Sequence, residues 1–206
     1  MIVETLPVGP LQTNCYLVGC EQTHLGAVVD PGGDPGVILS AVERRGLTLE
    51  VILLTHAHFD HIGGLAELAA ATHAHVALHP DDLPLLHAKG GAAMFGIFLP
   101  PGPEPDLALS AGQVIKVGTL RFDVMHTPGH TPGHVTFYEP TAKAAFDGDV
   151  LFMQGIGRTD FPGSSHQQLM ESIRNKLFVL PDDTTIYPGH GPATTVGDEK
   201  WSNPFL

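Results

Sequence analysis

The chain has 206 residues, of which 43% are hydrophobic and 16% charged, and its net charge is −12. This acidity argues against a nucleic-acid partner, because phosphate contacts need clustered Lys and Arg. No apolar run approaches the roughly 20 residues of a membrane-spanning helix, and Met1–Pro10 lacks the basic start and apolar run of a signal peptide, so we expect one cytoplasmic domain over residues 1–206 with no membrane partner.

Apolar and β-branched runs predict a series of strands along the chain. These strands are expected at Ile2–Val8, Cys15–Val18, Gly26–Asp30, Val51–Thr55, His75–His79, Gln113–Val117, Arg121–His126, Val135–Tyr138, Ala144–Asp147 and Thr184–Tyr187. Cys15 and Cys20 are an odd number of residues apart in one run, which places their side chains on opposite faces, so we expect no disulfide between them.

Three helices are predicted from capping residues and periodicity. Asp34 and Pro35 are typical of an N-cap and a first helical residue, and Gly46 is typical of the end of that helix. A second helix is expected over about 61–71. A third should begin at a capping box, Ser165 to Gln168. Because helices fall between groups of strands, we expect an α/β (α+β) fold of packed sheets flanked by helices, and not a regular doubly wound sheet.

The segment Gly90–Asp106 is rich in Gly and Pro but also holds large apolar residues. We expect a loop here. Long loops in compact domains often carry function, so two interpretations stay open: a cap on the core, or a wall or lid that faces substrate.

Histidines are unusually frequent, with thirteen against ten Lys plus Arg. Histidine is the commonest protein ligand of metals. Directly after the apolar run Val51–Thr55 come His56, His58, Asp60 and His61. Alternation places His56 and His58 on one side of the backbone. So many polar groups at the end of a buried strand would be costly without partners, and this crowding predicts a site for two cations.

Three later motifs place a further metal-binding side chain after a strand and next to glycine. They contain His130 in Thr127–His134, Asp149 in Phe146–Asp149, and His190 in Tyr187–Pro192. Glycine beside each of these residues gives the backbone freedom to aim the side chain inward. One such motif is weak evidence, but four in this order are specific.

Together the four motifs resemble those of the metallo-β-lactamase superfamily, and within it the short bacterial glyoxalase II type, the hydroxyacylglutathione hydrolases. The resemblance extends from Asp30–Gly33 to the His190 motif. It implies a four-layer αββα sandwich of two mixed sheets, with two divalent metal ions at one edge, zinc in the first place and iron or manganese as alternatives. The implied ligands are His56, His58 and His130 for one ion, Asp60, His61 and His190 for the other, and Asp149 as a bridge.

The resemblance implies a metal-dependent hydrolase acting on a small-molecule thioester such as S-lactoylglutathione. A hydroxide held between the two ions would attack the acyl carbon, with Asp60 and Asp149 as the catalytic carboxylates. Arg158 would contact a glutathione carboxylate, or else pair with an acid such as Asp160. Asp30 and His134 are expected to support the ligands from behind.

One departure concerns glutathione. The longer glyoxalase II enzymes have a C-terminal helical domain that adds glutathione contacts. This sequence ends sixteen residues after His190, so we expect no such domain.

Several other functions stay open. Persulfide dioxygenases share the motifs and use a single iron, which here would be held by His56, His130 and Asp149. Other hydrolases of this fold, such as lactonases and β-lactamases, and a non-catalytic scaffold are further alternatives. The pattern leaves the oligomeric state open.

Overall fold

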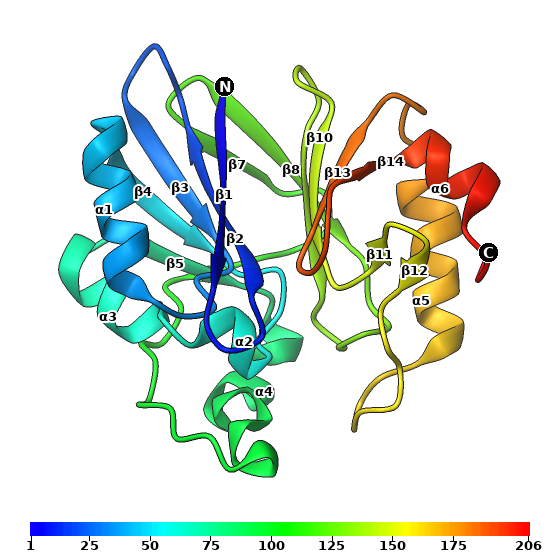
Figure 1. Cartoon of the computed structure of the whole chain (residues 1–206), viewed down its shortest axis with the longest axis horizontal. Coiled ribbons are helices and arrows are strands. Elements are labelled where there is room, and N and C mark those ends of the chain that lie inside the picture. Colours follow the sequence, from blue (N-terminus) through cyan, green and yellow to red (C-terminus); the bar gives the residue numbers. More distant parts are fainter. The chain divides into compact units, whose positions relative to one another are not determined.

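The computed structural model describes residues 1–206, which form two compact units. The N-terminal unit comprises residues 1–109 and 116–120, and the C-terminal unit comprises residues 110–115 and 121–206. Two six-stranded sheets account for most of the strands (Figure 1). No helix is both long enough and apolar enough to span a lipid bilayer. One domain over 1–206 stays a prediction.

The sheet of the N-terminal unit is mixed, with strand order β1-β2-β3-β4-β5-β6. Strands β1 to β3 form an antiparallel meander, and β3 to β6 run parallel. Their bounds are β1 Ile2–Val8, β2 Thr13–Gly19, β3 Leu25–Val29, β4 Thr48–Leu53, β5 His75–Leu78 and β6 Leu107–Ala108. Every residue of β2 is buried, as expected for a strand covered on both faces.

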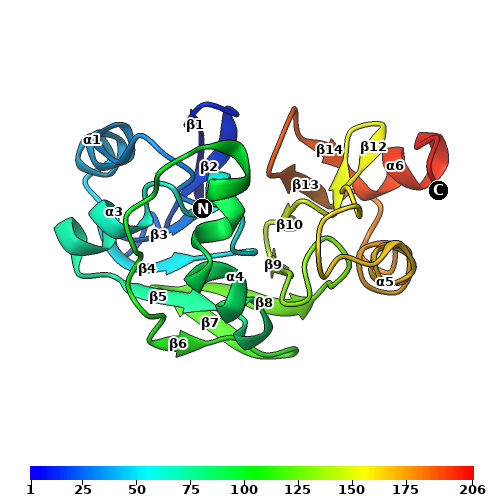
Figure 2. The ribbon, with the colours of Figure 1, turned by 90° about the horizontal axis from the view of Figure 1, so that it is seen from below.

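Helices connect the parallel strands of this sheet. They are α1 (Pro35–Arg45), α2 (Phe59–Ile62) and α3 (Leu65–Thr72). Figures 1 and 2 show α1 and α3 together on one face of the sheet. Ile38 of α1 and Leu65 of α3 share one buried cluster with Ile52 of β4. Burying an aliphatic side chain of this size contributes about 1.5–3 kcal/mol, so these contacts hold the helices on the sheet.

The predicted start of α1 is confirmed, whereas the helix expected over about 61–71 differs from the prediction. Asp34 is the N-cap residue of α1, but its side chain makes no capping bond, because Oδ2 accepts from the backbone N–H of Gly9 at 2.8 Å. The helix expected over about 61–71 is two helices, α2 and α3, separated at Gly63. A Cβ on Gly63 would lie 2.3 Å from the carbonyl oxygen of Gly32. The chain therefore turns where two backbones approach closely.

The segment after β5 is partly helical, and its helices extend into the region Gly90–Asp106, where the sequence predicted a loop. A 3₁₀ turn η1 (Pro80–Asp82), helix α4 (Leu83–His87) and η2 (Lys89–Phe95) follow one another, and Figure 2 labels α4. Gly90 and Gly91 both have positive φ, 63° and 75°. This pair lies between two short helical turns, and the sequence pattern did not predict either turn.

The second sheet has strand order β14-β13-β10-β9-β8-β7. Strand β13 runs parallel to β10, and the other described pairs are antiparallel. The bounds are β7 Val114–Val117, β8 Leu120–His126, β9 Val135–Glu139, β10 Ala144–Gly148, β13 Thr185–Pro188 and β14 Thr194–Thr195. A small hairpin, β11 (Leu151–Phe152) with β12 (Gly155–Ile156), stands apart from it.

Helix α5 (His166–Ser172) continues into a π-helical turn, η3 (Ile173–Leu177). The predicted cap is confirmed in part, since the Ser165 side chain accepts from the N–H of Gln168. Leu169, Ile173 and Leu177 are fully buried in one cluster with Ile186 of β13. These side chains therefore pack α5 and η3 against the second sheet.

Helix α6 (Val196–Ser202), which periodicity did not reveal, carries a buried carboxylate. Glu199 is 1% exposed and accepts hydrogen bonds from the Thr194 hydroxyl (2.6 Å), the Gln154 N–H (2.9 Å) and the Asn203 side-chain amide (2.8 Å). Because Gln154 lies between β11 and β12, this one side chain ties the small hairpin to α6.

We expect Glu199→Ala to lower the free energy of unfolding by about 3 kcal/mol, because it leaves several buried donors without an acceptor. Glu199→Gln should lose less, since its carbonyl oxygen still accepts and the Thr194 hydroxyl can rotate to accept from the new amide. Urea unfolding of both variants measures the difference. Equal stability of Glu199→Ala and the wild-type protein would contradict this role.

Candidate metal centre

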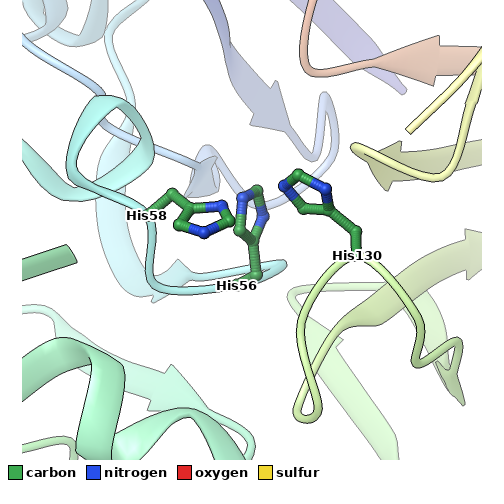
Figure 3. A group of neighbouring side chains, drawn as sticks. All are labelled: His56, His58 and His130. Atoms are coloured by element: carbon green, nitrogen blue, oxygen red, sulfur yellow. The ribbon is translucent and has the colours of Figure 1, made fainter. Parts of the chain in front are cut away.

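The first group of predicted ligands lies on the loop that leaves β4. His56 is fully buried and His58 is half-buried. Their rings meet edge to face with centroids 4.8 Å apart, and Figure 3 shows them side by side. His61 lies in the short helix α2 that follows this loop, and its ring centroid is 4.0 Å from that of His56. Three imidazoles of the N-terminal unit are thus gathered within one loop and the helix α2.

One buried carboxylate orients two of these histidines. Asp30, 2% exposed at the end of β3, accepts from the Thr55 N–H (2.7 Å), the Thr55 hydroxyl (2.6 Å) and His61 Nδ1 (2.9 Å). The Thr55 hydroxyl has a single proton, which it donates to Asp30, so at 3.0 Å it accepts from His56 Nδ1. Both rings are therefore protonated on Nδ1, and Nε2 of each carries a lone pair.

Asp60 lies beside His61, as the motif predicted. Its Oδ2 is 3.6 Å from His61 Nε2 and accepts from the Thr13 hydroxyl at 3.1 Å. A Cβ on Gly32 would lie 1.8 Å from the carbonyl oxygen of Asp60. Only glycine at position 32 lets the chain pass this close to the ligand-bearing turn, which gives the Asp30–Gly33 motif a steric reason.

A further carboxylate, which sequence reasoning did not single out, braces the same loop. Asp82 is fully buried at the end of η1, and its Oδ2 accepts from the Ala57 N–H at 3.0 Å. Ala57 lies between His56 and His58, so this bond fixes the backbone that carries both imidazoles. The only available signal was an acidic residue in an otherwise apolar stretch, and surface acids give the same signal.

His130 belongs to the C-terminal unit and comes from the loop after β8 (Figure 3). Its Nδ1 donates to the carbonyl oxygen of Arg158 at 2.8 Å, so Nε2 carries the lone pair in this ring as well. The start of α5 supports the loop, because the Ser165 N–H donates to the Gly129 carbonyl at 2.7 Å. Gly129 has a φ of 138°, and a Cβ there would lie 2.3 Å from the Leu169 nitrogen.

Asp149 lies close to His130 and His190, the two histidines of its own unit that are proposed as ligands. Its Oδ2 is 3.6 Å from His130 Nε2 and 3.8 Å from His190 Nε2. His190 follows β13, and the neighbouring Gly189 N–H donates to the Gly148 carbonyl at 2.7 Å. This bond joins the two loops that carry Asp149 and His190.

The structure places His134 directly behind Asp149. His134 is fully buried, and its Nε2 accepts from the Asp149 N–H at 3.1 Å. Its proton is therefore on Nδ1, which donates to the Thr127 hydroxyl at 3.1 Å. The ring thus links the His130 loop to the backbone of Asp149.

Asp147 is a second buried carboxylate that the sequence analysis did not select. It is fully buried, and its Oδ2 accepts from the Leu151 N–H at 3.0 Å. Burial raises the pKa of this carboxyl well above its usual range, and the charge of Asp149 acts in the same direction. The Leu151 bond closes the turn that presents Asp149.

Arg158 has its guanidinium engaged by a neighbour. Nε and one terminal nitrogen donate to the two carboxylate oxygens of Asp160 at 2.8 and 2.7 Å, and the group lies 4.2 Å from the centre of the Phe161 ring. This pair raises the pKa of Arg158 and lowers that of Asp160. The contact with substrate stays a prediction, whereas the backbone of Arg158 already has a role in orienting His130.

The donor set fits divalent metal ions. His56, His61 and His130 are each held at Nδ1 by a protein group, the arrangement that metal-binding histidines usually show. Oδ2 of Asp60 lies 3.6 Å from Nε2 of His61, and Oδ2 of Asp149 lies 3.6 and 3.8 Å from Nε2 of His130 and His190. These distances are too long for hydrogen bonds but close to the roughly 3.4 Å between two ligands of one tetrahedral ion.

Comparison with known proteins shows which family the chain resembles. The profile of the Metallo-beta-lactamase superfamily matches residues 8–190. The chain is 40% identical to the hydroxyacylglutathione hydrolase GloC of Haemophilus influenzae, over 100% of this chain and 98% of that protein.

Two solved structures share the fold along the whole chain. The BLEG-1 B3 metallo-beta-lactamase superposes with a TM-score of 0.94 at 40% identity, covering 100% of this chain and 99% of that one. The protein TTHA1623 in a di-iron-bound form superposes with a TM-score of 0.90 at 43% identity, covering 100% of both chains. The predicted α/β fold with two mixed sheets and helices is confirmed. The chain belongs to the metallo-beta-lactamase superfamily of metal-binding hydrolases.

Proposed function

We propose that this protein hydrolyses a small-molecule thioester, as a glyoxalase II-like enzyme, with two divalent metal ions. The observation that carries the thioester assignment is the full-length likeness to a hydroxyacylglutathione hydrolase at 40% identity. The metal ligands that we propose are His56, His58, Asp60, His61, His130, Asp149 and His190. A cytoplasmic location and zinc as the preferred metal belong to the same proposal.

The proposed metal ions and the two carboxylates would act on water and substrate. When bound, two divalent ions lower the pKa of a water molecule and polarise a carbonyl group. Asp60, held by the Thr13 hydroxyl, would orient that water toward the acyl carbon. Asp149, held from behind by His134, would keep His130 and His190 in place.

Thioester hydrolysis suits a site whose donors are all imidazoles and carboxylates. The carbon–oxygen bond to water forms, the carbon–sulfur bond breaks, and the electron pair leaves with sulfur. A thiol has a pKa of about 8.5, so the thiolate leaves without a proton donor. An amide would need one. Arg158 could reach a glutathione carboxylate only by exchanging its bidentate partner Asp160, so glutathione recognition needs a direct test.

An activity panel on protein of measured metal content tests the proposal. We expect S-lactoylglutathione to be hydrolysed in air-free buffer, with two metal ions per chain and no oxygen uptake. Treatment with a chelator should abolish the activity, and added metal should restore it. One iron per chain together with oxygen uptake on glutathione persulfide would overturn the thioesterase assignment, as would hydrolysis of a β-lactam or lactone without any thioester.

A further inference from the structure

A group of large apolar side chains is exposed on the N-terminal unit at the end of η2. Met94 is 69% exposed, Phe95 52% and Phe98 83%. Protein surfaces rarely gather large apolar residues without a binding role. We call these three residues the apolar wall.

The wall is built directly on the loop that carries the metal ligands. A Cβ on Gly90 would lie 2.1 Å from the Phe59 nitrogen and 2.6 Å from the His58 carbonyl carbon. The backbone at Gly90, with its positive φ of 63°, therefore packs against the peptide bond between a proposed ligand and the residue after it. In Figure 1, α4 lies directly below α2, and η2 packs against α2.

Aromatic contacts extend this attachment outward. The Phe95 ring lies 5.0 Å from the Phe59 ring, and Phe59 is buried between His58 and Asp60 in the chain. The Lys89 ammonium lies 5.0 Å from the centre of the Phe98 ring, a cation–π contact that favours one ring position. The turn between these aromatic residues is closed by the Ile97 N–H, which donates to the Ala92 carbonyl at 3.0 Å. The apolar wall is thus a shaped surface and not a loose tail.

We propose that the apolar wall receives the acyl group of the substrate, and that the preferred acyl group is apolar and longer than lactoyl. This inference rests on the proposed thioesterase function and specifies its substrate. The acyl carbon must lie at the metals, and Phe95 of the wall packs against Phe59, the residue that follows His58. A small hydroxylated acyl group would leave Met94 and Phe98 in water, whereas each methylene buried against them would favour binding by up to about fourfold.

A chain-length series on the full, metal-loaded chain tests the wall. We would measure kcat/KM for acetyl, butyryl and hexanoyl glutathione with the wild-type protein and with Met94→Ser/Phe98→Ser. Phe95 is left in place because it packs on Phe59. The matched control is Val179→Ser/Trp201→Ser, which removes apolar side chains that are 69% and 84% exposed on the C-terminal unit.

We expect wild-type kcat/KM to rise with chain length, and the ratio of hexanoyl to acetyl to fall at least about tenfold in Met94→Ser/Phe98→Ser. The control should keep the wild-type ratio. Equal use of acetyl and hexanoyl thioesters by the wild-type protein would overturn the acyl-binding role of the wall but not the proposed thioesterase function. Hydrolysis of no thioester at any length would overturn both. A dimer that dissociates in Met94→Ser/Phe98→Ser, with an unchanged ratio, would assign the surface to self-association instead.

Discussion

Asp149→Ala is expected to lose metal and activity together. In the structure, its Oδ2 lies within 3.8 Å of Nε2 of both His130 and His190, so one carboxylate serves two imidazoles. Even groups that only support a ligand are worth about 10- to 100-fold in metal affinity or activity. We therefore expect a drop in turnover of more than about a hundredfold, and fewer than two metal ions per chain.

Metal analysis by mass spectrometry and steady-state kinetics on the same preparation check this prediction. The matched control is Asp183→Ala, which removes an exposed carboxylate of the same unit that pairs with Lys143. Circular dichroism should show that both variants fold. A fully metal-loaded and active Asp149→Ala protein is incompatible with the bridging role.

Asp30→Asn should weaken metal binding by about 10- to 100-fold, although residue 30 is not among the proposed ligands. The Asp30 carboxylate is the acceptor in three hydrogen bonds, two from Thr55 and one from His61. An asparagine must place its NH₂ group against at least one of them. If the amide faces His61 Nδ1, it favours the tautomer with the proton on Nε2, which removes the lone pair that would bind metal. If it faces the Thr55 N–H instead, two donors meet in a buried site.

Titration of metal-free protein with zinc against a chromophoric chelator measures this loss. Glu199→Gln is the control, because it makes the same oxygen-to-amide change at a buried carboxylate that bonds to Gln154, Thr194 and Asn203 and to none of the proposed ligands. It should keep wild-type affinity. Unfolding in urea separates loss of affinity from loss of fold. Wild-type zinc affinity in Asp30→Asn would show that the carboxylate does not determine which nitrogen of the His61 ring carries the proton.

Local patterns were sufficient to predict most of the strands. The runs predicted at 2–8 and 121–126 match β1 and most of β8, because alternation and β-branching act between near neighbours. Short elements escaped the prediction. β6, β11, β12 and β14 have two residues each, which is too few for any periodicity, and they form because a partner strand is already in place.

The helical content of the segment after β5 was missed for a related reason. The Gly and Pro residues there are typical of loops, yet α4 and η2 form between them. Gly90 lies between two short helical turns, where it is required both by its positive φ of 63° and by the close approach to Phe59. The sequence shows the same letter for a glycine in a loop and for a glycine between two short helices.

By itself, the sequence indicated the family and the seven candidate ligands, because the order of the four motifs that resemble the family is visible in one dimension. Only the tertiary structure decided what holds those ligands. Asp30 and His61 are 31 residues apart, His130 and the Arg158 carbonyl are 28 apart, and Ala57 and Asp82 are 25 apart. A backbone carbonyl leaves no mark on the sequence, and a buried carboxylate is written with the same letter as an exposed one. The protonation of His56, His61 and His130 on Nδ1 is therefore a property of the folded chain.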